Sequence, residues 1–373
     1  MGRHTYQYAY SLPDSDYSTL DVFSAEGRKD IVRKRGSHVN REIELLSLVE
    51  NVPGVIKRIK RIKLSKSSEE RELCMRKYEG DLSYLMRGKA ARCTGNVKVP
   101  FTLHEILPQM VRLLTTFDIM HGMGFCHNDL KPQNIFYDEK ENLYVGDFDL
   151  SRQYTTEDME RFRQAKQDYK NGVKRDYLSE LSIRYHPGTF IYTSPEGLIF
   201  KADLEVWEGP RYPVTDIWSL GCIFFEMLTL RVFNTSTFHI EEPGRFVYKK
   251  RWLDEEDPLE LLDVFTEDMN IEGFGIYGDK WREKLALRKK ELFSPMKVVV
   301  SYQNATRDGK CKLGTEDRNN LTDLLNGMLD PNFLTRLSAK ECLENPLFKD
   351  HLHISETMWK YYEEKKARTK TAE

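Results

Sequence analysis

The sequence predicts an α+β fold with two unequal lobes, in which a small strand-rich lobe precedes a larger, mainly helical one. The first observation is the alternation of aromatic and polar residues over residues 5–35, which is typical of half-buried strands. The second is a change near residue 102, after which apolar residues recur at helical spacing. The third is length, because 373 residues can bury a substantial core as one large domain or two smaller ones.

The helix of the first lobe is indicated by the residues at its ends. Ser37 is the expected N-cap of a helix that continues to Val49 and ends before Pro53 and Gly54. The next run, residues 55–64, mixes apolar and basic side chains. It fits a half-exposed strand, or else a basic patch for nuclear import or nucleic-acid binding.

Three helices are expected in the second lobe. They cover residues 103–123, 216–230 and 321–329. In the first of them, the apolar residues at helical spacing are Ile106, Met110, Leu113, Leu114, Phe117 and Met120. No internal repeat or low-complexity segment interrupts the pattern.

Composition excludes several classes of function. The chain has 57 Lys and Arg against 59 Asp and Glu, so its near-neutral charge favours neither nucleic acid nor a membrane as a partner. The longest apolar stretch, residues 217–230, is too short to span a bilayer, and the first ten residues lack the apolar core of a signal peptide. Six scattered cysteines without a CxxC pair argue against zinc and disulfides and indicate an intracellular location, in the cytoplasm or nucleus. The oligomeric state stays open.

One segment carries the chemistry, and it reads His-Asn-Asp-Leu-Lys-Pro-Gln-Asn-Ile over residues 127–135. Within it, Asp129 can orient and deprotonate a hydroxyl, and Lys131 can neutralise a moving phosphate. Asn134 and the later Asp147, in Gly-Asp-Phe-Asp, can hold Mg²⁺. Together they are the parts of a phosphoryl-transfer site.

These two segments resemble the catalytic and metal-binding loops of eukaryotic protein kinases, and the resemblance extends over about residues 8–348. It implies that Asp129 is the catalytic base and that Lys131 contacts the phosphate. It also implies that Asn134 and Asp147 bind magnesium, with ATP as the phosphoryl donor. The Lys-Pro-Gln-Asn form is similar to Ser/Thr kinases rather than to tyrosine kinases.

The resemblance also divides the chain into parts. They are an N-lobe (1–80), a C-lobe (81–350) with a long activation segment (147–196) and an insert (about 233–320), and a C-terminal tail (351–373). The middle of the activation segment, residues 159–174, is charged and is expected to be helical or mobile. The tail is expected to be a charged helix or disordered, and in either case a solvated end.

Three further motifs resemble structural parts of the same family. Residues 188–196 are similar to the end of an activation segment, where Thr189 bonds near the catalytic base. The resemblance pairs Glu196 with a buried Arg336, and such a pair is structural because either charge alone is costly to bury. Asp216 matches the residue that braces the catalytic-loop backbone.

The family's glycine-rich loop is the weakest match. Leu12 and Leu20 keep its apolar ends, but all three glycines between them are replaced. Pro13 removes an N–H donor, and Asp14 and Asp16 bring negative charge toward the phosphates. We expect reduced ATP affinity or a loop further from the nucleotide, and an acidic turn without a role in binding is the alternative.

Lys34 is the expected lysine on the α- and β-phosphates, from its spacing after Leu20. Arg33 and Arg35 lie on the opposite face of the same expected strand, so a shift of one residue would change this assignment. The expected ion-pair partner of Lys34 is Glu42, which lies only eight residues later on the predicted helix. The ion pair therefore requires a connecting loop of about two residues.

The stretch that starts at Leu73 resembles the kinase hinge. Met75 would line the back of an adenine pocket, backbone groups of Arg76 and Tyr78 would bind the adenine edge, and Asp81 would reach the ribose. A plain buried strand followed by a turn remains the alternative.

Two positions depart from the family pattern near the catalytic residues. Asn128 replaces the arginine that normally receives an activation-loop phosphate, so we expect activity that does not depend on such a phosphate. Asp149 replaces a glycine, which predicts restricted movement of this loop. Its side chain is expected to be solvated or else to add a carboxylate beside the metal.

The leading hypothesis is a Ser/Thr protein kinase that transfers the γ-phosphoryl group of Mg-ATP to a protein hydroxyl. The alternative is a catalytically weak or inactive kinase-like scaffold or allosteric module, which the lost glycines, Asn128 and Asp149 favour. A small-molecule kinase is disfavoured by Thr189 and the Ser-Pro-Glu sequence at 194–196.

Overall fold

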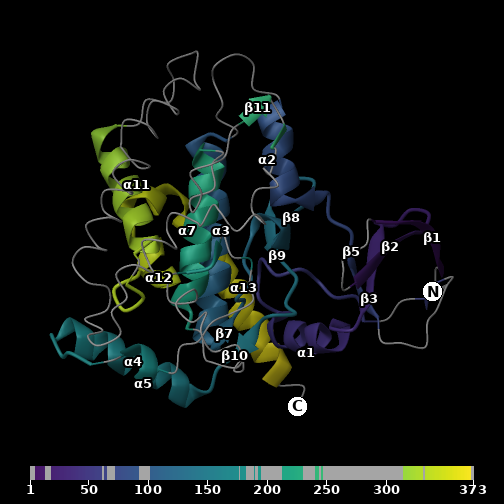
Figure 1. Cartoon of the computed structure of the whole chain (residues 1–373). Coiled ribbons are helices and arrows are strands. Elements are labelled where there is room, and N and C mark those ends of the chain that lie inside the picture. The colour runs from purple at the N-terminus through teal and green to yellow at the C-terminus, as the bar shows by residue number, and fades with distance from the viewer. Residues whose placement is uncertain are drawn as a thin grey trace, which may run out of the picture.

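The computed structural model describes residues 5–12, 18–60, 63–64, 72–91, 101–175, 177–181, 189, 192–194, 212–229, 240–242, 245–246, 314–330 and 332–370. In Figure 1 the strands near the N-terminus form one end of the molecule, and helices make up most of the larger remainder. This arrangement confirms the predicted α+β fold with a strand-rich region before a helical one.

The strand-rich region is a five-stranded sheet in the order β4-β1-β2-β3-β5. The strands are β1 (Thr5–Ser11), β2 (Ser18–Ser24), β3 (Ile31–Gly36), β4 (Lys63–Leu64) and β5 (Leu73–Arg76). The neighbouring pairs are antiparallel except β1 and β4, which are parallel. The register places Lys34 opposite both Leu20 and Leu73, so two predicted cofactor residues lie side by side on β2 and β3.

Helix α1 (Val39–Val49) follows β3 after two residues and ends close to where the sequence predicted. The predicted N-cap is wrong, because the helix begins after His38 rather than Ser37, and His38 makes no side-chain cap hydrogen bond. Burial rather than capping fixes this helix, since Val39, Ile43, Leu46 and Val49 form its apolar face against the core.

The prediction of one half-exposed strand over residues 55–64 is wrong. Among the described residues of this run, Lys63 and Leu64 form strand β4, whereas Val55 and Arg58 form isolated bridges. Val55 and Ile56 are buried, and the Ile56 N–H donates to the carbonyl of Val145 at 2.9 Å. The segment therefore starts against the helical region, where Val55 and Ile56 are buried, and reaches the sheet at Arg58, which bridges Met75, and at β4, which pairs with β1.

The helical region is built around a long helix, α3. Its helices are α2 (Leu82–Ala91), α3 (Leu103–Gly122), α4 (Thr156–Lys170), α5 (Tyr177–Glu180), α7 (Val214–Thr229), α11 (Thr315–Met328), α12 (Ala339–Leu343) and α13 (Leu352–Lys370). The predicted helices at 103–123, 216–230 and 321–329 are confirmed as α3, α7 and α11. Thr102 and Glu105 form a capping box that begins α3, as a threonine followed by a glutamate three residues later favours.

Short strands place the catalytic segment. They are β6 (Gly80–Asp81), β7 (Phe125–Cys126), β8 (Ile135–Tyr137), β9 (Leu143–Val145) and β10 (Arg152–Gln153). The motif at 127–135 leaves β7, passes through the short 3-10 helix η1 (Pro132–Asn134) and enters β8, so both of its ends are held by backbone pairing. A further short pair, β11 (Ile240–Glu242) and β12 (Arg245–Phe246), and the start of α11 are the described parts of the expected insert.

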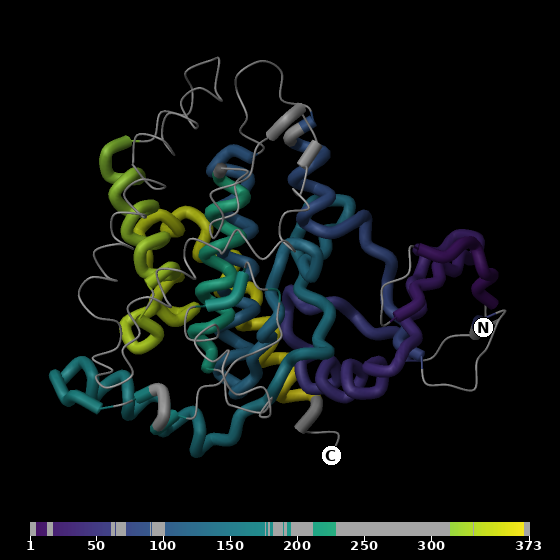
Figure 2. The backbone as a smooth tube through the Cα atoms, viewed as in Figure 1, coloured from purple at the N-terminus to yellow at the C-terminus, as the bar shows by residue number. Residues whose placement is uncertain are grey.

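The C-terminal tail forms a charged helix, as one expectation had it, but only the part after Tyr362 is mostly solvated, because the earlier part packs against the molecule. In Figure 2 the yellow C-terminal helix starts behind the other helices and runs to the lower edge of the molecule, and α13 contacts α3 and the 3-10 helix η4 (Pro346–His351). Met358 and Tyr362 are buried on its inner face. The charged residues that suggested a solvated end occupy only its outer face.

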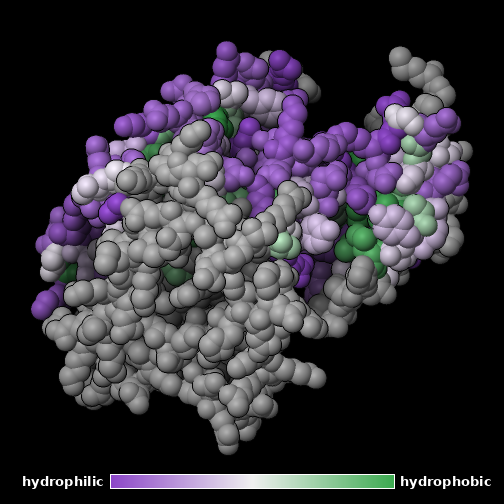
Figure 3. Space-filling model, turned by 90° about the horizontal axis from the view of Figure 1, so that it is seen from above, coloured by the Kyte–Doolittle hydropathy of each residue, from purple (hydrophilic) through white to green (hydrophobic). Residues whose placement is uncertain are grey.

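On the face that Figure 3 shows, the described residues are mostly hydrophilic. Seen from above in Figure 3, hydrophobic side chains gather at the end where Figure 1 shows the five-stranded sheet. None of the helices in the described ranges is long and apolar enough to cross a membrane.

Candidate active site

Asp216 on α7 braces the catalytic segment by accepting hydrogen bonds from its backbone. Its Oδ2 accepts hydrogen bonds from the His127 N–H at 2.9 Å and from the His121 ring at 3.0 Å, and its Oδ1 accepts from the Asn128 N–H at 2.9 Å. Asn128 has a φ of 68°, and this left-handed turn aims both N–H groups at one carboxylate. The predicted bracing contact is therefore present.

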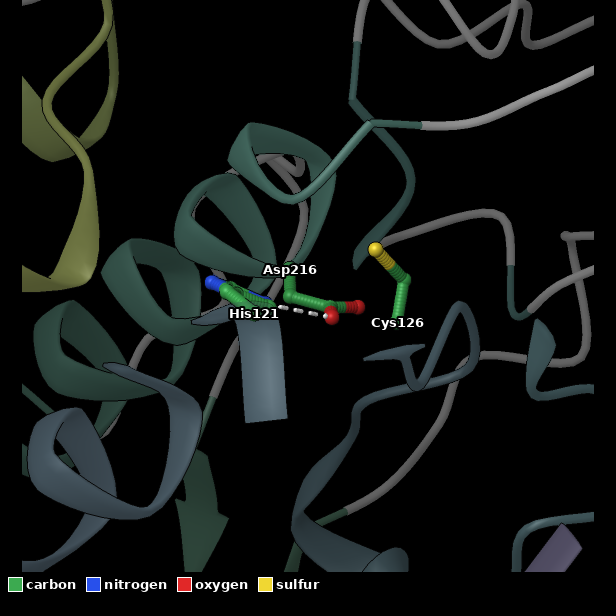
Figure 4. A group of neighbouring side chains, drawn as sticks. All are labelled: His121, Cys126 and Asp216. Carbon is green, nitrogen blue, oxygen red and sulfur yellow. Dashed lines mark hydrogen bonds and ion pairs between the residues drawn. The ribbon is translucent and has the colours of Figure 1, made fainter. Parts of the chain in front are cut away.

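Figure 4 shows His121, Cys126 and Asp216 close together, a composition that a metal ion could use. Both carboxylate oxygens are already committed to the three donors, and Figure 4 marks the bond between His121 and Asp216. Burial raises the pKa of Asp216, but hydrogen bonding and charge from His121 outweigh it and hold the pKa below its ordinary value. We interpret the cluster as a structural brace.

Asp129, the predicted base, is held by four donors. Its Oδ1 accepts from the Thr189 N–H at 2.7 Å and the Thr189 hydroxyl at 2.9 Å. Its Oδ2 accepts from Lys131 Nζ at 2.8 Å and Asn134 Nδ2 at 3.2 Å. The structure thus brings together Asp129, Lys131, Asn134 and Thr189, and the carboxylate has one defined orientation.

Lys34 reaches the same region from the sheet. Its Nζ lies 2.8 Å from Glu42 Oε2 on α1 and 2.6 Å from Asp147 Oδ1. Burial lowers the pKa of Lys34, but the two carboxylates outweigh it and raise the pKa above its ordinary value. Burial raises the pKa of Glu42 against the opposing charge of Lys34. The two-residue connection between β3 and α1 does allow the ion pair.

The neighbouring arginines face the other way. Arg33 Nη2 lies 2.7 Å from Asp21 Oδ2, and Arg35 Nη2 lies 2.9 Å from the same oxygen. Of these three basic residues of β3, Lys34 is therefore the one that the structure brings to Glu42 and Asp147.

Asp147 and Asn134 have oxygen atoms that suit a magnesium ion. Asn134 Nδ2 donates to the Asp129 carbonyl at 2.8 Å, which commits the nitrogen side of the amide to the catalytic segment. Among the described residues, no hydrogen bond ends on Asn134 Oδ1 or on Asp147 Oδ2. A carboxylate oxygen and an amide oxygen are hard donors, so this pair fits Mg²⁺.

The structure corrects the expectation that the Asp149 side chain is solvated. Its side chain is half-buried rather than solvated. Burial and the nearby charge of Asp147 raise the pKa of the Asp149 carboxyl. Its backbone is not left-handed, because the described non-glycine residues with positive φ are Asn128, Glu141 and Asp147. Loss of the family's glycine therefore causes no backbone strain in this conformation.

The ends of the expected nucleotide loop lie together. The Leu12 N–H donates to the Leu20 carbonyl at 2.8 Å, and both side chains are partly buried against the core. Residues 13–17, which include Asp14 and Asp16, lie outside the described residues. Both alternatives for the loop, a contact with the nucleotide and an acidic turn without a role in binding, concern these residues.

The hinge residues leave the sheet in order. Met75 is buried on β5 opposite Val32, and Arg76 ends that strand. The Tyr78 ring packs on Tyr144, with ring centroids 5.1 Å apart, so its side chain anchors the connection to the helical region. Asp81 Oδ1 accepts from the Tyr84 N–H at 2.9 Å and caps α2, a contact that the sequence did not predict.

Sequence reasoning missed two buried contacts that support the site. His121 lies on α3, far along the chain from Asp216, and its position in the last turn of a helix is only a weak signal. Tyr192, in the activation segment, donates its hydroxyl to Glu226 Oε2 on α7 at 2.6 Å. The predicted partner of Arg336, Glu196, lies outside the described residues. Arg336 is itself fully buried.

Glu226 predicts a specific dependence of stability on pH. Burial raises its pKa from 4.5 to about 7, with the Tyr192 hydroxyl opposing the shift. Between these values the folded protein keeps a proton that the unfolded chain loses, so the free energy of unfolding should fall as pH rises. We expect Glu226→Gln to be more stable than wild type above pH 7 by about 1–3 kcal/mol, and nearly equal near pH 4.5.

Urea unfolding of both proteins across this pH range measures the difference. A stability difference that does not change with pH would contradict the assignment to Glu226. The glutamine can still accept the Tyr192 hydroxyl, so the comparison isolates the charge.

Comparisons with known proteins agree with this geometry. The chain matches the family described as Protein kinase domain over residues 22–348. It is 26% identical over 336 residues to Cyclin-dependent kinase 11 of Dictyostelium discoideum, covering 89% of this chain and 74% of that protein. It is 26% identical over 310 residues to Serine/threonine-protein kinase ppk23 of Schizosaccharomyces pombe, covering 83% and 60%. It is 25% identical over 280 residues to Serine/threonine-protein kinase ssn3 of Emericella nidulans, covering 70% and 58%.

The chain therefore spans less than two thirds of the second and third of these relatives. The family match nevertheless covers most of the chain, and it contains both the braced catalytic segment and the Lys34–Glu42 pair. This chain belongs to the protein kinase family and is a protein serine/threonine kinase.

Proposed function

We propose that the chain is catalytically active and transfers the γ-phosphoryl group of Mg-ATP to a Ser or Thr hydroxyl of a protein substrate. The observation that carries this is the meeting of Lys34 with Glu42 and Asp147, at 2.8 and 2.6 Å, beside an Asp129 held by four donors. These groups come from segments that are far apart in sequence. Their convergence supports a working site over a degenerate one.

The proposed role of Asp129 is to accept the proton of the substrate hydroxyl. Thr189, Lys131 and Asn134 hold its carboxylate in place, so little reorganisation is needed when the hydroxyl arrives. Lys131 Nζ lies 2.8 Å from Asp129, where its positive charge can stabilise the phosphoryl group in transfer.

Nucleotide and metal would use the remaining groups. Lys34 would contact the α- and β-phosphates, with Glu42 fixing its position. Asn134 and Asp147 would hold Mg²⁺, which supplies charge neutralisation for the phosphates. Leu12, Leu20 and Met75 would surround the adenine. Backbone groups of Arg76 and Tyr78 would bind its edge, and Asp81 would bind the ribose.

The test is transfer of radiolabelled γ-phosphate from ATP to a panel of proteins, with and without a chelator of divalent cations. We expect magnesium-dependent incorporation, with the label recovered on serine or threonine after acid hydrolysis. Nucleotide binding without any incorporation would favour the scaffold alternative. Label on tyrosine, or on a small molecule alone, would exclude the proposed substrate class.

We also infer an intracellular location. Cys74, Cys222 and Cys342 are buried cysteines outside any disulfide in the described part of the chain, and such thiols suit a reducing compartment. Fractionation of cells that express the tagged full chain would test it. Recovery of the protein from the medium would contradict it.

A further inference from the structure

Helix α4 of the activation segment is docked on the helical region through an aromatic stack. Phe162 is buried, and its ring lies parallel to that of Tyr212, with centroids 4.4 Å apart and an angle of 8°. Tyr154, just before α4, stacks on the same tyrosine at 5.9 Å. Phe333 lies 6.4 Å from Phe162. The apolar face of α4 is therefore fully used within this chain.

Polar contacts fix the same helix at its N-terminus and along its length. Thr155 and Asp158 form a capping box, so the residues just after β10 begin a helix without help from a partner. Lys166 Nζ donates to the Arg336 carbonyl at 3.1 Å. Arg161 donates to the Glu180 carbonyl at 2.6 Å, which joins α4 to α5.

The stack also reaches the part of the segment that follows α4. The Tyr212 hydroxyl donates to the Leu181 carbonyl at 3.2 Å, and Leu181 and Tyr177 are buried. Tyr212 therefore contacts the segment twice, once through its ring and once through its hydroxyl. Beyond Leu181, Thr189 donates two hydrogen bonds to Asp129.

The catalytic segment has no arginine at the position that would bind an activating phosphate. Asn128 Nδ2 instead donates to the Leu150 carbonyl at 3.3 Å, near the start of the activation segment. An amide is neutral and cannot compensate a phosphate charge. The described activation segment is thus held without a phosphate, by the contact at Leu150, by the packing and polar contacts of α4, and by the bonds of Thr189 to Asp129 and Lys131.

We propose that α4 is a permanent clamp, which holds the activation segment in the substrate-accepting conformation in place of a phosphate. The proposal rests on the proposed function, because it assigns the regulation of the same site. Its physical basis is that a buried helix face cannot be released without exposing Phe162 and Tyr212 to water. Phe162 is a positioning residue, since it acts on Asp129 only through the segment and Thr189.

The experiment compares wild type with Phe162→Ala and Lys166→Ala in the full chain. Arg163→Ala is the matched control, because Arg163 lies on the exposed face of α4 and pairs there with Glu160. Hydrogen exchange is measured on peptides that contain Leu181 or Thr189. Transfer rates are measured after phosphatase treatment, and affinity for a non-hydrolysable ATP analogue is measured separately.

We expect phosphatase-treated wild type to keep its activity. Phe162→Ala should speed exchange at Leu181 and Thr189 and lower kcat/KM for the protein substrate roughly tenfold, since the stacked pair biases the segment by about that factor. Nucleotide affinity should not change, because in the described part of the chain the side chains of Phe162 and Lys166 contact Tyr212, Phe333 and Arg336, which are not among the residues proposed to bind ATP. Lys166→Ala should change exchange and kcat/KM in the same direction by less, and Arg163→Ala should match wild type.

Several results would overturn the clamp. One is loss of wild-type activity on phosphatase treatment. Another is unchanged exchange at Thr189 in folded Phe162→Ala. A third is faster exchange in Phe162→Ala with unchanged kcat/KM. If Phe162→Ala does not fold, Lys166→Ala decides by the same criteria. A wild type without transfer activity would refute the proposed function, and the exchange measurements would then decide on the clamp alone.

Discussion

Replacing Asp129 by Asn is expected to lower the kcat of phosphoryl transfer by about 10²–10⁴-fold, the usual contribution of a positioned general base. The asparagine has nearly the same shape, but its single oxygen can accept either from Thr189 or from Lys131, because these residues donate to different oxygens of Asp129. It also loses the ability to take the proton of the substrate hydroxyl. The affinity for nucleotide should stay the same, because Asp129 contacts the substrate side of the site.

The measurement is kcat and KM for ATP in the radiolabel assay, with thermal unfolding to verify the fold. Asp323→Asn is the matched control, since Asp323 is an exposed aspartate on α11. We expect the control to behave as wild type. Equal transfer by wild type and Asp129→Asn would remove Asp129 from its assigned role and would favour a contaminating kinase as the source of the signal.

Replacing Asp147 by Asn is expected to lower kcat by about 100-fold or more, since a metal supplies several kcal/mol of charge stabilisation. In contrast to Asp129→Asn, this variant should also weaken metal binding. The reason is that Asp147 contributes a carboxylate oxygen that takes no hydrogen bond from the described residues. Lys34 keeps its pair with Glu42, so the N-terminal side of the site should remain assembled.

Calorimetric titration of Mg²⁺ and Mn²⁺ into the complex with a non-hydrolysable ATP analogue separates the two effects. We expect weaker metal binding in Asp147→Asn and unchanged binding in Asp323→Asn. If both variants bind metal as wild type does, Asp147 is not a metal ligand, whatever its effect on kcat.

Helix periodicity and local motifs were enough to predict much of the fold. The apolar spacing of α3, α7 and α11 reports directly which face must be buried, so their existence could be predicted with boundaries a few residues off. The prediction of a strand over residues 55–64 was wrong. A mixture of apolar and basic residues does not show whether a segment pairs as a strand or is held by burial of its apolar side chains. The same ambiguity applies to α13, whose charged sequence conceals a buried face with Met358 and Tyr362.

The candidate site was predictable where spacing along the chain is short. Asp129, Lys131 and Asn134 lie in one segment whose geometry is set locally, and they meet as expected. Lys34 and Glu42 were harder, since a shift of one residue on β3 exchanges its two faces. In the structure Lys34 forms an ion pair with Glu42, whereas Arg33 and Arg35 form ion pairs with Asp21.

The sequence by itself determined the chemistry of this protein, because the identity and spacing of its carboxylates, amide and lysines define which groups can act on a phosphate. Only the tertiary structure decided how those groups are held. The bonds from His121 to Asp216, from Tyr192 to Glu226 and the stacking of Phe162 on Tyr212 each join distant segments. Such contacts depend on packing in three dimensions, and no local pattern of residues encodes them.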